Sequence, residues 1–169
     1  MITIRRNVFE TNSSSTHSVT ITDSTLMPSE FEIKRDWDIC DGEPYISVDL
    51  VGFCSFPVDS QNDKLAYLVE QIAYLTGNYL ALGWYGSKEE NEAARQALYD
   101  TEEFKELESA ICDYAGCKHI RINTATEGYI DHDSVVADMN ELLQYDVPYQ
   151  GLAALVFGKD TYVYFEFCG

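Results

Sequence analysis

The stretch SQNDKLAYLVEQIAYLTG, residues 60–77, is the most strongly patterned part of this 169-residue sequence. Its apolar residues follow the three-four spacing that places them on one side of a helix, namely Leu65, Leu68, Val69, Ile72 and Leu75. Ser60 is a preferred residue just before a helix, and Gly77 is a typical stop just after one. The pattern therefore predicts a helix over residues 61–76.

Two more helices are predicted to follow, each beginning at a capping residue. Ser87, with Glu90 three residues later, forms the capping-box pattern and predicts a helix that ends near Tyr99. Thr101 is placed to cap the next helix, which keeps its apolar spacing up to Gly116. The centre of the chain is therefore predicted to be helical.

Alternating apolar and polar residues predict strands toward both ends of the chain. Residues 2–9 and 17–22 alternate in this way, and the polar segment between them predicts a β-hairpin with a long loop. Residues 152–157 and 161–167 flank Gly158-Lys159-Asp160 and predict a closing hairpin. Further strands are predicted at residues 31–34, 45–50 and 119–123.

These elements together predict a single α+β domain spanning residues 1–169. It has an antiparallel or mixed sheet that begins with the N-terminal β-hairpin, about four helices and a C-terminal β-hairpin. Between the predicted strands at 31–34 and 45–50, Asp41-Gly42 predicts a turn, and Pro44 predicts a break in strand pairing.

The charge of the chain is strongly negative. Eleven Lys and Arg against 29 Asp and Glu give a formal net charge of −18. Such a field repels nucleic acid and anionic membranes, so generic DNA binding and membrane binding are disfavoured. It suits a partner with a basic groove, although solubility alone would also explain it.

The cysteines and the N-terminus bear on the compartment. Five cysteines, without a CxxC pair, lack the spacing of a zinc site, and only Cys112 and Cys117 are close in sequence, where a helix is predicted to end. Neither a leader-like apolar segment nor a stretch long enough for a membrane helix is seen. We therefore expect a cytoplasmic protein with reduced thiols and with neither a metal nor a cofactor, and the oligomeric state is left open.

The first candidate site is ETNSSSTHS, residues 10–18, with the basic residues before it. Arg side chains bind phosphate, hydroxyls bond its oxygens and His moves a proton near neutral pH, so this group would suit a phosphate ester. The phosphate-binding candidates are Arg5, Arg6 and Asn12, and the catalytic candidates are Ser14, Ser15 and His17. The alternative is a polar hairpin loop held by its own Asn and Ser side chains.

The second candidate site is EGYIDHDS, residues 127–134, in which Asp131 precedes His132. A carboxylate can orient an imidazole for acid-base or nucleophilic catalysis, so both residues are catalytic candidates. The alternative is a turn followed by a fourth helix, capped by Asp133 or Ser134. Catalysis would gain support if His17 and His132 met in space.

A third candidate is an acidic helical surface. From Lys88 to Glu108 the sequence carries eight acids and three bases. Glu102, Glu103 and Glu106 are candidate partner-binding residues within it. The alternative is an ordinary solvated helix surface.

Two motifs carry a family resemblance. IRRNVFETNSSSTHS, residues 4–18, resembles the N-terminal signature of a loosely defined family of small proteins from Gram-positive bacteria, their phages and mobile elements. GYIDHDS, residues 128–134, resembles a second patch of that family. The resemblance implies a mobile-element origin. Some proteins of this type resemble type II anti-CRISPR proteins, which inhibit Cas9, and one such group is thought to act on guide RNA.

We therefore expect a phage or mobile-element accessory protein that inhibits a host nucleic-acid-targeting defence in the bacterial cytoplasm. Its best target is a Cas9-type effector or the guide RNA of that effector. It would act either by acidic docking or as a ribonuclease that uses His17, so whether it is an enzyme stays open. The alternative is a small stand-alone hydrolase or nuclease that acts on a phosphate ester through the Ser/His loop.

Overall fold

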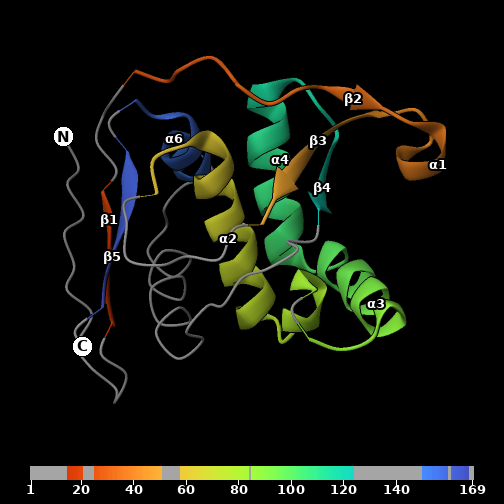
Figure 1. The fold of residues 1–169 in the computed structure, drawn as a ribbon. Coiled ribbons are helices and arrows are strands. Elements are labelled where there is room, and N and C mark those ends of the chain that lie inside the picture. The colour runs from red at the N-terminus through yellow and green to blue at the C-terminus, as the bar shows by residue number, and fades with distance from the viewer. Residues whose placement is uncertain are drawn as a thin grey trace.

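The computed structural model describes residues 15–20, 25–50, 58–83, 85–123, 150–159 and 161–167, and it has an α+β fold (Figure 1). Its strands are β1 (Ser15–Thr20), β2 (Lys34–Arg35), β3 (Pro44–Asp49), β4 (His119–Asn123) and β5 (Tyr162–Phe167). Its helices are α1 (Trp37–Cys40), α2 (Gln61–Leu75), the 3₁₀ helix η1 (Tyr79–Leu82), α3 (Lys88–Tyr99), α4 (Glu102–Ala115) and α6 (Gln150–Phe157).

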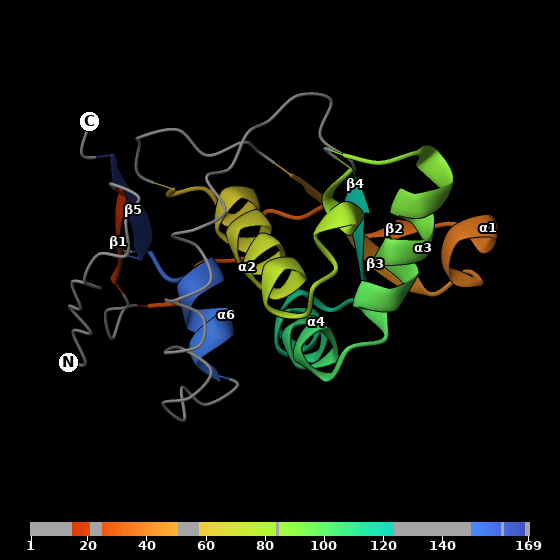
Figure 2. The same ribbon diagram turned by 90° about the horizontal axis from the view of Figure 1, so that it is seen from below.

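Helix α2 lies at the centre of the fold. Figures 1 and 2 show α4 and α6 beside it, the β2-β3-β4 sheet with α3 and α1 toward one end, and the β1-β5 pair beyond α6 at the other. Most of the buried apolar residues in the described part of the chain form one cluster, to which α2, α4, α6, β3 and β4 all contribute. Burial of this cluster away from water is the main force that holds the elements together.

The three central helices begin where the sequence predicts. The hydroxyl oxygen of Ser60 accepts a hydrogen bond from the Asp63 backbone N–H at 3.1 Å, which caps α2. Ser87 and Glu90 form the predicted capping box of α3. Thr101 caps α4 through the Phe104 backbone N–H at 3.2 Å. Each cap satisfies a backbone donor that the helix itself leaves unpaired.

The central sheet is mixed, with the strand order β2-β3-β4. β2 pairs antiparallel with β3, whereas β3 and β4 are parallel and are connected through α2, α3 and α4. The prediction that Pro44 breaks pairing is wrong, because Pro44 is the first residue of β3 and lies opposite Arg35. The first position of a strand tolerates a missing N–H.

The predicted C-terminal hairpin is also corrected. Its second half is the strand β5, but its first half, residues 152–157, belongs to helix α6. The segment is a continuous apolar run, and such a run fits a buried helix as well as a strand. β5 pairs instead with β1, so that Ser15 lies opposite Phe167 and Thr20 opposite Tyr162. The first strand of the predicted N-terminal hairpin and the predicted fourth helix lie outside the described residues.

Candidate functional site

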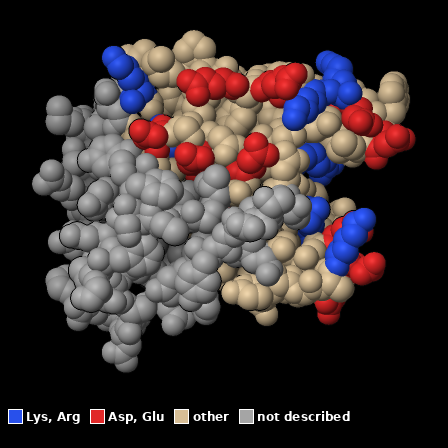
Figure 3. All heavy atoms as spheres, in the orientation of Figure 1, with Lys and Arg blue, Asp and Glu red and all other residues tan. Residues whose placement is uncertain are grey.

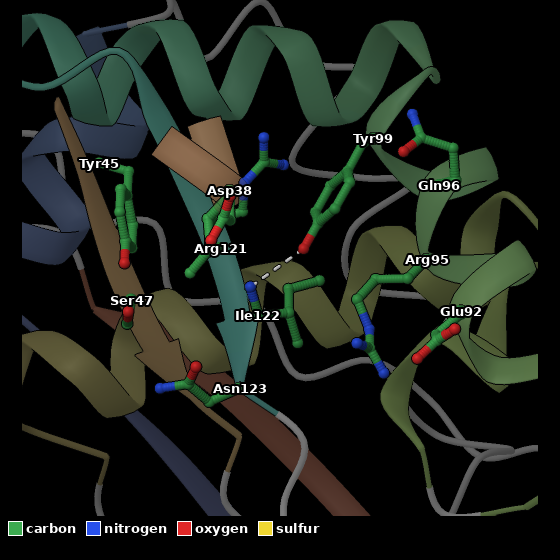
Figure 4. Close-up of a pocket in the computed structure, with 11 residues that line it drawn as sticks. Asp38, Tyr45, Ser47, Glu92, Arg95, Gln96, Tyr99, Arg121, Ile122 and Asn123 are labelled. Atoms are coloured by element: carbon green, nitrogen blue, oxygen red, sulfur yellow. Dashed lines mark hydrogen bonds between the residues drawn. The ribbon is translucent and has the colours of Figure 1, made fainter. Parts of the chain in front are cut away.

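A cleft of about 570 Å³ lies over the outer face of the central sheet, between α1 and α3 (Figure 4). Its floor comes from β3 and β4, through Ser47, Arg121 and Asn123. Its walls come from α1 and α3, the latter through Arg95 and Tyr99. We call it the sheet-face cleft.

Strand alternation places Arg121 in this cleft. Ile120 and Ile122 are buried in the core, so the side chain between them must point to the opposite face of the sheet. There the Nε of Arg121 donates to the Cys40 Sγ at 3.0 Å. The guanidinium also lies 4.8 Å from the centre of the Tyr99 ring, in a cation-π contact. Arg121 is therefore held in one orientation by two different elements.

Arg95 enters the sheet-face cleft from α3. Its Nε donates to the backbone carbonyl of Ala81 in η1 at 3.4 Å. Figure 4 shows Glu92 beside it, and Glu92 pairs with Lys88 at 3.7 Å. Among the described residues, the terminal nitrogens of Arg95 form no hydrogen bond or ion pair, so this guanidinium keeps donors for an anionic group.

The free edge of β4 is closed by side chains. The Ile122 backbone N–H donates to the Tyr99 hydroxyl at 3.1 Å, the dashed line in Figure 4. The Ile120 backbone N–H donates to the Glu108 carboxylate at 2.9 Å. These donors would otherwise be open to pairing with another strand. The bonds also fix α3 and α4 against the sheet that forms the cleft floor.

The acidic surface predicted from Lys88 to Glu108 falls on α3 and α4, and its partner-binding candidates lie on α4. Glu102 and Glu106 are exposed, and Glu103 is half-buried. Within the part of the chain that the structure describes, none of these carboxylates forms an ion pair or a hydrogen bond. On the side of the molecule that Figure 3 shows, most Lys and Arg gather toward the end with β2, β4 and α3.

The N-terminal candidates are placed only in part. The backbones of Ser15 and His17 belong to β1, where His17 lies opposite Phe165. The other candidates of the two polar motifs lie outside the described residues, namely Arg5, Arg6, Asn12, Ser14, Asp131 and His132. The hypothesis that His17 and His132 share a site therefore stays a prediction.

Comparison with known proteins assigns the chain to no family. The chain matches no protein-family model, no curated protein and no solved structure. Among the described residues, no group of three or more His, Cys, Asp or Glu is arranged to hold a metal ion. None of the helices in that part of the chain is both long enough and apolar enough to cross a membrane.

Sequence reasoning did not identify the sheet-face cleft. The alternation of residues 119–123 indicates the face of Arg121, but the approach of α1 and α3 to that face depends on tertiary packing. Arg95 lies between the apolar positions of α3, and no local sequence pattern indicates that it lines a cleft.

Proposed function

We propose that this chain is an accessory protein of a phage or mobile element that inhibits a Cas9-type effector. The resemblance of residues 4–18 and 128–134 supports the class. The mode of action that we propose is docking, in which the acidic helical surface occupies a basic channel of the effector that otherwise holds nucleic acid.

The observation that carries this mode is the set of carboxylates on α4. Glu102, Glu103 and Glu106 have no cationic partner among the described residues, so their charge is available to a basic surface. The net charge of −18 would speed the encounter with such a surface. Nucleic-acid channels are rich in Lys and Arg because they bind phosphates, and carboxylates can compete for the same side chains.

The test is a cleavage assay with a preassembled effector and guide RNA. The variant carries Glu102→Gln, Glu103→Gln and Glu106→Gln, which keep helix propensity and remove charge. We expect it to need an inhibitor concentration at least about tenfold higher than the wild type, since tenfold in affinity corresponds to about 1.4 kcal/mol. Added salt should weaken the wild type more than the variant.

A matched control removes the same charge elsewhere. Glu32→Gln, Asp41→Asn and Glu43→Gln alter exposed residues near α1, outside α4. This control should inhibit nearly as well as the wild type if the position of the charge matters. An equal loss of inhibition in both variants would mean that only the net charge matters, and not the position of the carboxylates. If the wild type does not inhibit the effector, the proposal is refuted.

The same reactions also test the enzymatic alternative. The guide RNA is recovered and run on a denaturing gel, with His17→Ala as the variant. Shortened RNA with the wild type and intact RNA with His17→Ala would replace docking by a ribonuclease mechanism. Intact RNA in both lanes, together with inhibition, supports docking.

A further inference from the structure

Two cysteines meet where α4 ends. Cys112 lies in the last turn of α4, Gly116 follows the helix with φ of 79°, and Cys117 comes next. The backbone N–H groups of Gly116 and Cys117 both donate to the Cys112 carbonyl, at 2.8 Å and 3.1 Å. The second bond is the six-to-one bond of a Schellman motif, which brings the first and last residues of the turn together.

The side chains of this pair point at each other. The two sulfur atoms lie 2.7 Å apart, and both residues are buried, with 4% and 7% of their surfaces exposed. In Schellman motifs these two positions frequently make an apolar contact, and here both are thiols. A disulfide bond is about 2.05 Å long, so the two sulfur atoms already lie within roughly 0.7 Å of bonding distance.

The surroundings distinguish the two thiols. The hydrogen bond between them raises the pKa of Cys112 and lowers that of Cys117, with burial opposing the fall at Cys117. Glu108, one turn earlier on α4, repels a negative charge on either sulfur, and it lies 3.4 Å from the Nδ1 of His119. The first proton is therefore lost from Cys117, and a thiolate is the form that reacts with oxidants.

We propose that Cys112 and Cys117 form a redox-active dithiol that closes to a disulfide with a peroxide as the oxidant. The Cys117 thiolate attacks one peroxide oxygen, the O–O bond breaks, and, with one proton taken up, Cys117 sulfenic acid and one water result. The Cys112 sulfur then attacks the Cys117 sulfur, the S–O bond breaks and a second water leaves. Two electrons from a dithiol reductant restore both thiols.

The disulfide would staple α4 to the segment that leads into β4. Cys117 directly precedes Lys118, whose backbone N–H donates to the Pro44 carbonyl at 2.7 Å, and β4 begins at the next residue. The same strand carries Arg121 on the floor of the sheet-face cleft. Oxidation should therefore reduce opening of the contact between α4 and β4. This chemistry is independent of docking on a Cas9-type effector.

The experiment treats the full chain, purified in reductant and then desalted, with hydrogen peroxide. The remaining thiols are then blocked with iodoacetamide in denaturant, because Cys40, Cys112 and Cys117 are buried in the folded protein. Peptide mass spectrometry should find Cys112 joined to Cys117 and Cys40 alkylated. Cys112→Ser and Cys117→Ser should each abolish the crosslinked peptide, whereas Cys40→Ser, the matched buried control, should retain it.

Thermal unfolding gives a second readout. The oxidised wild type should melt roughly 2–8 °C above the reduced form, as expected when a short loop is closed, and Cys112→Ser should show no such shift. Thiols that stay alkylatable at peroxide concentrations that oxidise a free dithiol would overturn the proposal. Disulfides that join other pairs of cysteines equally well would overturn it too. An unchanged melting temperature would contradict the inference that the disulfide stabilises the contact between α4 and β4.

Discussion

Helices α2 and α4 have similar lengths and similar caps, but their polar sides differ. In α4, buried apolar residues such as Phe104 and Leu107 lie on one side, and exposed acids such as Glu106 lie on the other. In α2, every residue from 64 to 73 is buried, including polar ones. The comparison shows that an apolar stripe predicts a helix, but not whether its polar side meets water or protein.

The buried polar residues of α2 differ in whether their side chains form hydrogen bonds. Gln61 accepts from the Glu30 backbone N–H at 2.8 Å and donates to the Pro28 carbonyl at 2.9 Å. The Lys64 ammonium donates to the Gly158 carbonyl and the Thr161 hydroxyl, at 3.3 Å and 3.1 Å. The Glu70 carboxylate, fully buried, has no hydrogen-bond partner among the described residues. A buried charge without a partner is costly, so Glu70 is where α2 departs most from α4.

The largest expected effect tests what the helices share. Phe104→Ala in α4 and Leu68→Ala in α2 both empty space at fully buried positions. We expect each to lower the free energy of unfolding by about 2–5 kcal/mol, measured by urea denaturation. A loss below about 1 kcal/mol in either helix would contradict its place in the common core.

The second prediction tests where the helices differ. Burial, followed by repulsion from Asp63, raises the pKa of Glu70 well above its ordinary value of 4.5. The stability that this group contributes is therefore present below the unfolded pKa and is lost as pH rises toward the folded pKa. Glu70→Gln should stabilise the protein by about 1–3 kcal/mol at neutral pH, because the amide has no cost of protonation or of charge burial in the folded state.

The control for this prediction is the pH dependence. Urea denaturation at about pH 8 and about pH 5.5 should show that Glu70→Gln raises the free energy of unfolding more at the higher pH. The Glu70 carboxyl destabilises the wild type less at a pH close to its unfolded pKa. A Glu70→Gln variant that is less stable than the wild type at both pH values would mean that the carboxylate has a favourable partner.

Caps should have similar effects in both helices. Ser60→Ala removes the acceptor for the Asp63 N–H in α2, and Thr101→Ala removes the acceptor for the Phe104 N–H in α4. Each should cost about 1 kcal/mol in chemical denaturation. Thr101 also donates to the Leu98 carbonyl at 2.7 Å, so its loss should be the greater of the two. A clearly larger loss at Ser60 would run against the similarity of the caps.

The smallest effect is expected on the outer side of α4. Glu106→Gln alters an exposed side chain without a described partner, so the free energy of unfolding should change by less than about 0.5 kcal/mol. Glu70→Gln measured in parallel supplies the contrast. An effect at Glu106 as large as at Glu70 would remove the distinction between the two helices.

Local patterns predicted the elements better than their partners. The caps at Ser60, Ser87 and Thr101 and the apolar spacing after them are local signals, and they located α2, α3 and α4. The parallel pairing of β3 with β4, the pairing of β1 with β5 and the sheet-face cleft depend on contacts between distant segments. No window of neighbouring residues contains that information.

The continuous apolar run in α6 shows a different limit. Residues 152–157 have no polar interruption that would reveal a period, so a strand and a buried helix fit equally well. The acidic surface of α4, by contrast, was predicted because charge and helical spacing coincide there. Glu70 was not recognised as buried, since its position in the helix resembles that of any exposed acid.

The pairing of β1 with β5 has a consequence during synthesis. Roughly 140 residues of chain separate the two strands, so at about 5–20 residues per second β1 leaves the ribosome roughly 7–28 s before β5. Throughout that interval β1 lacks the strand that it pairs with in the native fold. The β1-β5 pair therefore cannot form until β5 has been synthesised, and until then the edge of β1 is open to chaperones or to another nascent chain.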